Sequence, residues 1–70
     1  MKYYFTLYIS VEKFMPYYRG QTQTFVTTTT SGQKVQFPAM HLRRFMTTNG
    51  IKGSFCLETQ NNKFISLVKL

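Results

Sequence analysis

The sequence predicts an α+β protein that is mainly β, with five strands and two short helices in the order β-α-β-β-α-β-β. Two observations lead to this prediction: apolar residues alternate along most segments, and Gly, Asn or Pro separates consecutive segments. We expect one five-stranded, mostly antiparallel sheet, or a small open barrel, with the helices closing its ends. Residues 1–70 contain no linker and no internal repeat, so we expect a single domain.

The first strand is predicted over residues 2–10. Its odd positions are apolar and give it one buried face, formed by Tyr3, Phe5, Leu7 and Ile9. Tyr4 and Tyr8 fall on the opposite face, where we expect them to be exposed to solvent.

A short helix is predicted over residues 11–18. Ser10 is a favourable N-cap, and Gly20 can end the helix. The spacing i, i+3, i+4 gives it one apolar face, formed by Phe14, Tyr17 and Tyr18. Pro16 lies deep in this helix and removes a backbone hydrogen bond, so we expect an irregular end.

A hairpin is predicted next. Residues 21–30 contain six Thr and one Val, a composition that favours a strand. Ser31 and Gly32 are typical of a hairpin turn. The returning strand covers residues 34–37, with two apolar side chains facing inward, Val35 and Phe37.

The second helix is predicted over residues 39–46, with Pro38 presetting its first turn. Arg43 and Arg44 lie beside its apolar face. The apolar residues at helical spacing are Leu42, Phe45 and Met46.

Two strands complete the chain. Residues 51–58 alternate cleanly between apolar and polar side chains, which predicts an amphipathic strand. A turn at residues 60–62 leads into the last strand, residues 63–70. That strand has apolar residues at both odd and even positions, so we expect it to be central or covered on both faces.

The charge of the chain is strongly unbalanced. Nine Lys and Arg residues stand against two acidic ones, Glu12 and Glu58, and the formal net charge is +7. Such an excess concerns partners and solubility rather than the fold. Because the cations are spread along the chain, we expect a shallow polyanion-binding surface rather than a single recognition helix.

The sequence contains few of the residues that catalysis and metal binding require. One His, one Cys and two Glu are too few for general acid–base chemistry or for a structural zinc site. Cys56, His41 and Glu58 form a conceivable nucleophile, base and orienting group, but nothing else in the sequence supports this. No glycine-rich phosphate loop is present. We therefore expect no enzymatic activity, no metal and no cofactor.

The sequence predicts a cytoplasmic protein. A single Cys allows no disulfide within the chain. The apolar run at residues 3–9 is short and has no small-residue cleavage site, so it differs from a signal peptide. No stretch has the length needed to span a bilayer.

Several motifs give the chain a resemblance to a known family. They are Tyr17-Tyr18-Arg19-Gly20, Gln36-Phe37-Pro38-Ala39 with Leu42-Arg43 and Phe45, Gly50-Ile51 with Gly53 and Phe55, and the closing Phe64 with Ser66-Leu67 to Leu70. In these motifs the chain resembles a family of short, mainly gammaproteobacterial proteins that form a domain of unknown function. It departs from the family's pattern at Ser31, where an acidic residue is expected. The resemblance implies a stand-alone cytoplasmic domain with no known activity and no catalytic residues.

Basic and aromatic residues form the best candidate for a binding site. Exposed rings on a sheet stack on bases, and neighbouring cations follow the phosphates of single-stranded nucleic acid. The residues predicted to do this are Arg19, Arg43, Arg44, Lys34, Lys52, Tyr18, Tyr4 and Tyr8. We accordingly expect a nucleic-acid- or polyanion-binding accessory module, although no sequence-specific signature of such modules is present.

The same residues permit other interpretations. Tyr17 and Tyr18 can pack the first helix on the sheet while the cations keep a small protein soluble. Arg43 can form a structural ion pair with Glu12 or Glu58 instead of binding a ligand. The alternative function is that of a structural or protein-interaction module, acting as a homodimer or as a subunit of a larger complex.

Overall fold

The computed structural model describes residues 1–70 and contains the predicted elements in the predicted order. They are β1 (Lys2–Ile9), α1 (Val11–Tyr18), β2 (Thr24–Thr28), β3 (Lys34–Pro38), the 3₁₀ helix η1 (Ala39–Phe45), β4 (Ile51–Gln60) and β5 (Lys63–Lys69). The protein is therefore mainly β with two short helices, as predicted. Neither helix is long and apolar enough to cross a membrane.

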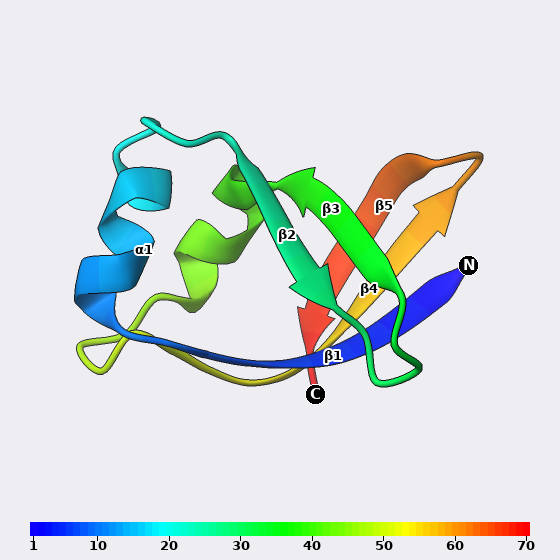
Figure 1. Cartoon of the computed structure of the whole chain (residues 1–70), viewed down its shortest axis with the longest axis horizontal. Helices are drawn as coiled ribbons and strands as arrows, with labels where there is room; N and C mark the ends of the chain where they lie inside the picture. The colour runs from blue at the N-terminus through cyan, green and yellow to red at the C-terminus, as the bar shows by residue number, and fades with distance from the viewer.

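The five strands form two antiparallel sheets, so the prediction of one five-stranded sheet is wrong. One sheet has the order β1-β4-β5, and β2 pairs only with β3. The reason lies in two inward-facing aromatic residues of the hairpin: Phe37 packs on the larger sheet, and Phe25 packs on Tyr17 of α1. The Phe37 ring lies 5.9 Å from the ring of Phe5 on β1. Figure 1 shows the β2–β3 hairpin crossing over one face of the larger sheet, with α1 and η1 together at one end.

A cluster of aromatic rings forms the core between the two sheets. Phe5 stacks between Phe37 and Phe55, with ring centroids 5.9 Å apart on each side. Phe5, Phe14 and Phe55 are almost completely buried. Large rings of this kind remove much apolar surface from water per residue, which allows a short chain to build a core.

The alternating pattern of β1 is confirmed. Phe5 and Leu7 are buried on the inner face of the sheet, whereas Tyr4 and Tyr8 are exposed on the outer face. In β2 the Thr-rich strand is shorter than predicted, because Thr29 already belongs to the turn. Its hydroxyl accepts a hydrogen bond from the backbone N–H of Gln33, at 3.1 Å.

Helix α1 has the predicted bounds and remains regular to its end, so the expected irregular end is corrected. The hydroxyl of Ser10 caps it by accepting a hydrogen bond from the N–H of Lys13, at 3.3 Å. Pro16 costs the helix one hydrogen bond, but its carbonyl accepts the N–H groups of Gln21 and Thr22, at 2.9 and 3.1 Å. The backbone beyond the helix is thereby fixed.

The second helix is a 3₁₀ helix rather than an α-helix. Its inward residues are Ala39, Leu42 and Phe45, which recur every three positions. A 3₁₀ helix brings positions i and i+3 onto one line, so this spacing suits it better than the α-helical period of 3.6. The Phe45 ring packs edge-on against Phe55, with centroids 5.1 Å apart.

Strand β5 lies at an edge of its sheet, so the prediction of a central or doubly covered strand is wrong. Glu58 on β4 pairs with Ser66, but Thr59 pairs with Phe64, which leaves Ile65 as an extra residue. This β-bulge exchanges the two faces of the strand. Apolar residues at odd and even positions consequently share the inner face, which holds Phe64 and Leu67.

Candidate functional site

The structure divides the residues predicted to bind a polyanion into separate groups. Two pairs each combine an exposed ring with a cation: Tyr8 with Lys52, and Tyr18 with Arg43. Tyr4 shares a strand face with Tyr8. The remaining cations of the predicted set lie elsewhere: Arg19, Arg44 and Lys34.

The first pair lies on the outer face, which we define as the surface of the β1-β4-β5 sheet turned away from the β2–β3 hairpin. Tyr4 is 46% exposed there and Tyr8 is 78% exposed. Tyr8 and Lys52 are direct partners across the strands β1 and β4. The Lys52 ammonium nitrogen lies 4.7 Å from the centroid of the Tyr8 ring, within the range of a cation–π interaction.

The remainder of the outer face is polar or mildly apolar. Between the two tyrosines, the hydroxyls of Thr6 and Ser54 lie 3.1 Å apart and form a hydrogen bond. Cys56 is buried between its strand partners Tyr4 and Val68. The acidic residue of this face, Glu58, lies at its end, opposite Lys2. The outer face therefore combines accessible rings, hydroxyls and a positive charge.

The second pair lies where α1 meets η1. The guanidinium carbon of Arg43 is 5.8 Å from the centroid of the Tyr18 ring, and Tyr18 is 48% exposed. Tyr17 differs from its neighbour, because its half-buried ring packs against Phe14 and Phe25, with centroids 5.7 and 5.3 Å away. Tyr17 thus belongs to the packing of the helix, while Tyr18 belongs to the surface.

Arg44 is engaged within the protein. Its guanidinium donates a hydrogen bond to the backbone carbonyl of Leu67 on the edge strand β5, and it lies 4.7 Å from the centroid of the Phe45 ring. The hydrogen bond to Leu67 holds η1 against β5. The two contacts leave Arg44 less free to meet a ligand than the sequence suggests.

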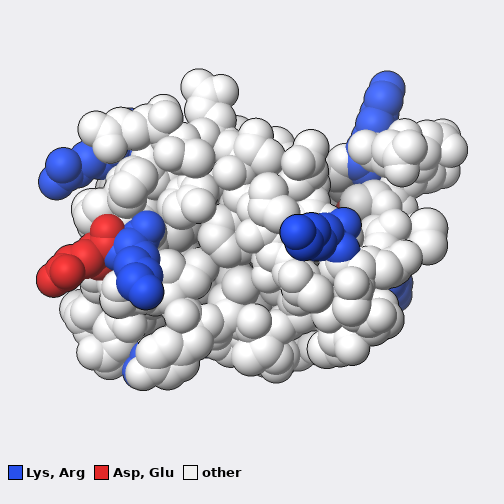
Figure 2. Space-filling view, viewed as in Figure 1, with Lys and Arg blue, Asp and Glu red and all other residues white.

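The other predicted cations are dispersed. Lys34 begins β3 and lines a cleft of about 320 Å³ together with Tyr3 and Leu57. Arg19 follows α1 as its exposed C-cap residue. Figure 2 shows the Lys and Arg side chains of one view at separated places, with uncharged surface between them. On the face shown, the positive charge is therefore not gathered into one patch.

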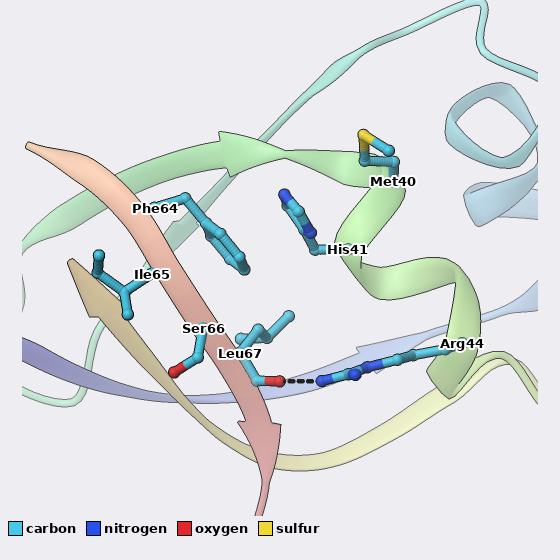
Figure 3. A pocket seen from close by; sticks show the side chains of 7 residues that line it. All are labelled: Met40, His41, Arg44, Phe64, Ile65, Ser66 and Leu67. Carbon is cyan, nitrogen blue, oxygen red and sulfur yellow. Dashed lines mark hydrogen bonds between the residues drawn. The ribbon is translucent and has the colours of Figure 1, made fainter.

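A feature that sequence reasoning missed is a cleft between η1 and β5, shown in Figure 3. It has a volume of about 270 Å³, and the His41 and Phe64 rings stack in it almost in parallel, 3.6 Å apart. Burial of the imidazole, together with the nearby positive charge of Arg44, lowers the pKa of His41 below its ordinary value of 6.5. The residues of this stack lie on different elements, so no local sequence pattern could have revealed it.

No group of three or more His, Cys, Asp or Glu side chains is arranged to hold a metal ion. In comparisons with known proteins, a family model described as "Protein of unknown function (DUF2835)" matches residues 1–70. This match confirms the resemblance to a family of unknown function. No curated protein and no solved structure matches the chain.

Proposed function

The chain belongs to the DUF2835 family, whose description names no activity, and from the geometry we propose that it is a non-enzymatic binding protein for single-stranded nucleic acid. The binding surface is the outer face of the β1-β4-β5 sheet. The observation that carries this proposal is the pairing of a 78% exposed Tyr8 ring with the Lys52 ammonium on an open sheet face.

Each partner of this pair has a defined role in binding. A nucleobase stacks on the Tyr8 ring, an interaction that contributes about 1–3 kcal/mol per base and tolerates any sequence. Lys52 carries its charge on a flexible four-carbon stem, so the ammonium can leave the ring and contact an adjoining phosphate while the base takes its place. The pair thereby offers both contacts that a single strand needs.

Tyr4 supplies a second stacking position. It lies four residues before Tyr8 on the same strand face, which corresponds to a separation of about 13 Å along an extended strand. Two rings at this separation contact two different nucleotides. The hydroxyls of Thr6 and Ser54 lie between them and can bond to sugar or phosphate oxygens.

The charge of the whole chain supports the same partner. A net charge of +7 attracts a polyanion over a long range and accelerates its association. Because Glu58 lies at the end of the outer face and opposite Lys2, it offers little repulsion to a bound strand. Contacts between cations and phosphates follow the sugar–phosphate backbone of the nucleic acid and give little preference for its sequence.

The positions of the few reactive side chains support a role without catalysis. Cys56 is buried on the outer face between Tyr4 and Val68. His41 instead stacks on Phe64 in the cleft beside β5. The nucleophile and the base that an enzyme would combine are thus kept apart.

One observation favours a second candidate, a homodimer formed through the same outer face. Val68 is 46% exposed beside Cys56, and with Tyr4 it forms an apolar strip that a second copy of the chain could cover. A dimer of this kind would bury Tyr4 and compete with nucleic acid. The two candidates therefore make opposite predictions for one surface.

The proposal is tested by titrating the protein into fluorescein-labelled oligo(dT) and oligo(rU) strands of about 12 nucleotides at low salt. Fluorescence anisotropy of the labelled strand measures binding. We expect saturable binding of both strands to a protein that sediments as a monomer. Absence of binding at low salt would contradict the proposal. A dimer that dissociates when Val68→Lys is introduced, and binds neither strand, would support the homodimer instead.

A further inference from the structure

Two sequence motifs that lie apart in the chain meet in one cleft. Residues of the Tyr17–Gly20 motif and of the Gln36–Phe45 motif both line a cleft of about 340 Å³, here called the α1–η1 cleft. This volume lies near the lower end of the range of about 300–1,000 Å³ that is typical of small-molecule sites. The residues that matter for its chemistry are Tyr17, Gly20, Thr22, Gln23, Met40 and Arg43.

The backbone that surrounds the α1–η1 cleft is fixed by hydrogen bonds. The carbonyl of Pro16 accepts the N–H groups of Gln21 and Thr22, which holds the segment after α1 in place. The carbonyl of Gln23 accepts the N–H of Ala39 at 2.8 Å, which joins that segment to the start of η1. The cleft is therefore formed before any ligand enters, and binding has little ordering entropy to overcome.

Arg43 gives the α1–η1 cleft its charge. It is the only charged residue in the lining, and no acidic side chain lines the cleft with it. The guanidinium carbon lies 5.8 Å from the centroid of the Tyr18 ring, and the Nη2 atom lies 3.9 Å from the position that a Cβ on Gly20 would occupy. Its planar array of N–H donors matches the oxygens of a phosphate or a carboxylate.

The walls beside Arg43 are apolar or neutral. Pro38 ends β3, Ala39 and Met40 begin η1, and Met40 is 61% exposed. Thr22 and Gln23 add neutral hydrogen-bonding groups to the lining. A flat or compact apolar body fits against the first wall while its anionic group reaches Arg43.

We propose that the α1–η1 cleft binds a small organic anion, in which a phosphate or carboxylate group is attached to a compact apolar body. Arg43 binds the anionic group, and Met40 and Pro38 contact the apolar body. This site is separate from the outer face of the sheet, so it does not depend on the function proposed above.

The experiment uses ¹⁵N-labelled protein and four probes: AMP, benzoate, adenosine and inorganic phosphate. We expect AMP or benzoate to give saturable shifts of the amide signals of Gly20, Thr22 and Ala39, and these shifts should persist in Tyr8→Ala, in which a base can no longer stack on the outer face. AMP supports a phosphate ligand, and benzoate supports a carboxylate. The proposal is overturned if neither probe shifts the cleft signals, or if adenosine or inorganic phosphate binds as tightly as they do.

A matched pair of variants tests the role of Arg43. Arg43→Gln should weaken the binding of the anion about tenfold or more, because a charge-assisted hydrogen bond is lost. Arg19→Gln removes the same charge from a neighbouring exposed residue that does not line the cleft, and it should change the affinity less than about twofold. Equal losses in the two variants would mean that only the net charge matters, and would overturn the site.

The same variants separate this proposal from the nucleic-acid proposal. Arg43→Gln should leave most of the oligonucleotide affinity intact, and Tyr8→Ala should leave anion binding unchanged. Arg43 makes only surface contacts, so we expect the variant to fold. An unchanged far-UV circular dichroism spectrum and unfolding midpoint would verify this.

Discussion

The Lys52 ammonium lies 4.7 Å from the centroid of the Tyr8 ring, across the pair of strands in which these residues are direct partners. This relationship places a cation and an accessible ring together on an open sheet face. Arg44 has a comparable contact with Phe45, but its guanidinium is also bonded to the carbonyl of Leu67. Of these two cation–ring pairs, the one on the outer face is the better placed to meet a ligand.

Binding of a single strand to the outer face should weaken as salt is added. Each phosphate that Lys52, Lys2 or another cation neutralises releases counterions, with a slope of about −0.7 per phosphate in a plot of log affinity against log salt. For two or three contacts we expect a slope between about −1.4 and −2.1. Anisotropy titrations over a range of KCl concentrations would measure it. A slope near zero would mean that phosphates are not contacted.

Arg44 should matter for stability more than other surface cations do. Arg44→Met removes the hydrogen bond to the Leu67 carbonyl and should lower the free energy of unfolding by about 1–2 kcal/mol. Arg19→Met serves as the control, since the Arg19 side chain is exposed, and it should stay within about 0.5 kcal/mol. Urea unfolding followed by circular dichroism compares the two. Equal effects would show that Arg44 does not fasten η1 to β5.

His41 should make the protein less stable in mild acid. Burial and the charge of Arg44 lower the pKa of His41 in the folded state below the value of 6.5 expected for the unfolded chain. The unfolded state therefore binds a proton at a higher pH than the folded state does. The contribution of neutral His41 to the free energy of unfolding is complete above about pH 7 and is lost as the pH falls through 6.5. Unfolding midpoints between about pH 7.5 and 5.5 would record this decline.

The control for this pH dependence is His41→Phe. The variant keeps an aromatic ring against Phe64 but cannot titrate, so its stability should change less over the same pH range. Glu12 and Glu58 are common to both proteins and cancel in the comparison. Identical pH profiles would exclude His41 as the source.

Two glycines with similar backbone angles should respond differently to the same substitution. Gly50 has φ of +90°, and a Cβ there would overlap the carbonyl oxygen of Ile9. Gly32 has φ of +86°, but no atom lies near the position of its Cβ. Gly32→Ala should cost about 1–2 kcal/mol from its backbone angle alone, whereas Gly50→Ala should cost about 4 kcal/mol or more. Thermal unfolding would measure both, and similar losses would contradict this packing at Gly50.

Local patterns in the sequence predict the elements well where one face of an element is buried. The alternation in β1 holds because Phe5 and Leu7 face the aromatic core. In β4 it holds for the same reason, with Phe55 and Leu57 on the inner face. Helix α1 is predicted by its cap, Ser10, and by the spacing of its apolar residues.

The arrangement of the strands depends on contacts that local patterns do not contain. A hairpin at β2 and β3 is predictable, but its position over the sheet results from the packing of Phe37 against the Phe5 ring of β1 and of Phe25 against the Tyr17 ring of α1. In β5 the extra residue, Ile65, shifts the alternation and makes an edge strand resemble a central one. A bulge of this kind is decided by pairing with β4.

The candidate sites were only half predictable for a similar reason. The alternation of apolar and polar residues in β1 is enough to predict that Tyr4 and Tyr8 are exposed. The neighbour of Tyr8 is set by the register between β1 and β4, which pairs it with Lys52. The stacking of His41 on Phe64 likewise depends on how η1 docks on β5.

The most direct test of the proposed function compares Tyr8→Ala with Tyr18→Ala in the affinity for a labelled single strand. Both substitutions remove an exposed tyrosine that lies beside a cation, but only Tyr8 belongs to the outer face. Tyr8→Ala should weaken binding about 5- to 150-fold, the loss of one stacked base. Tyr18→Ala should change the affinity less than about twofold. Unchanged affinity in Tyr8→Ala, or equal losses in the two variants, would contradict nucleic-acid binding through the outer face.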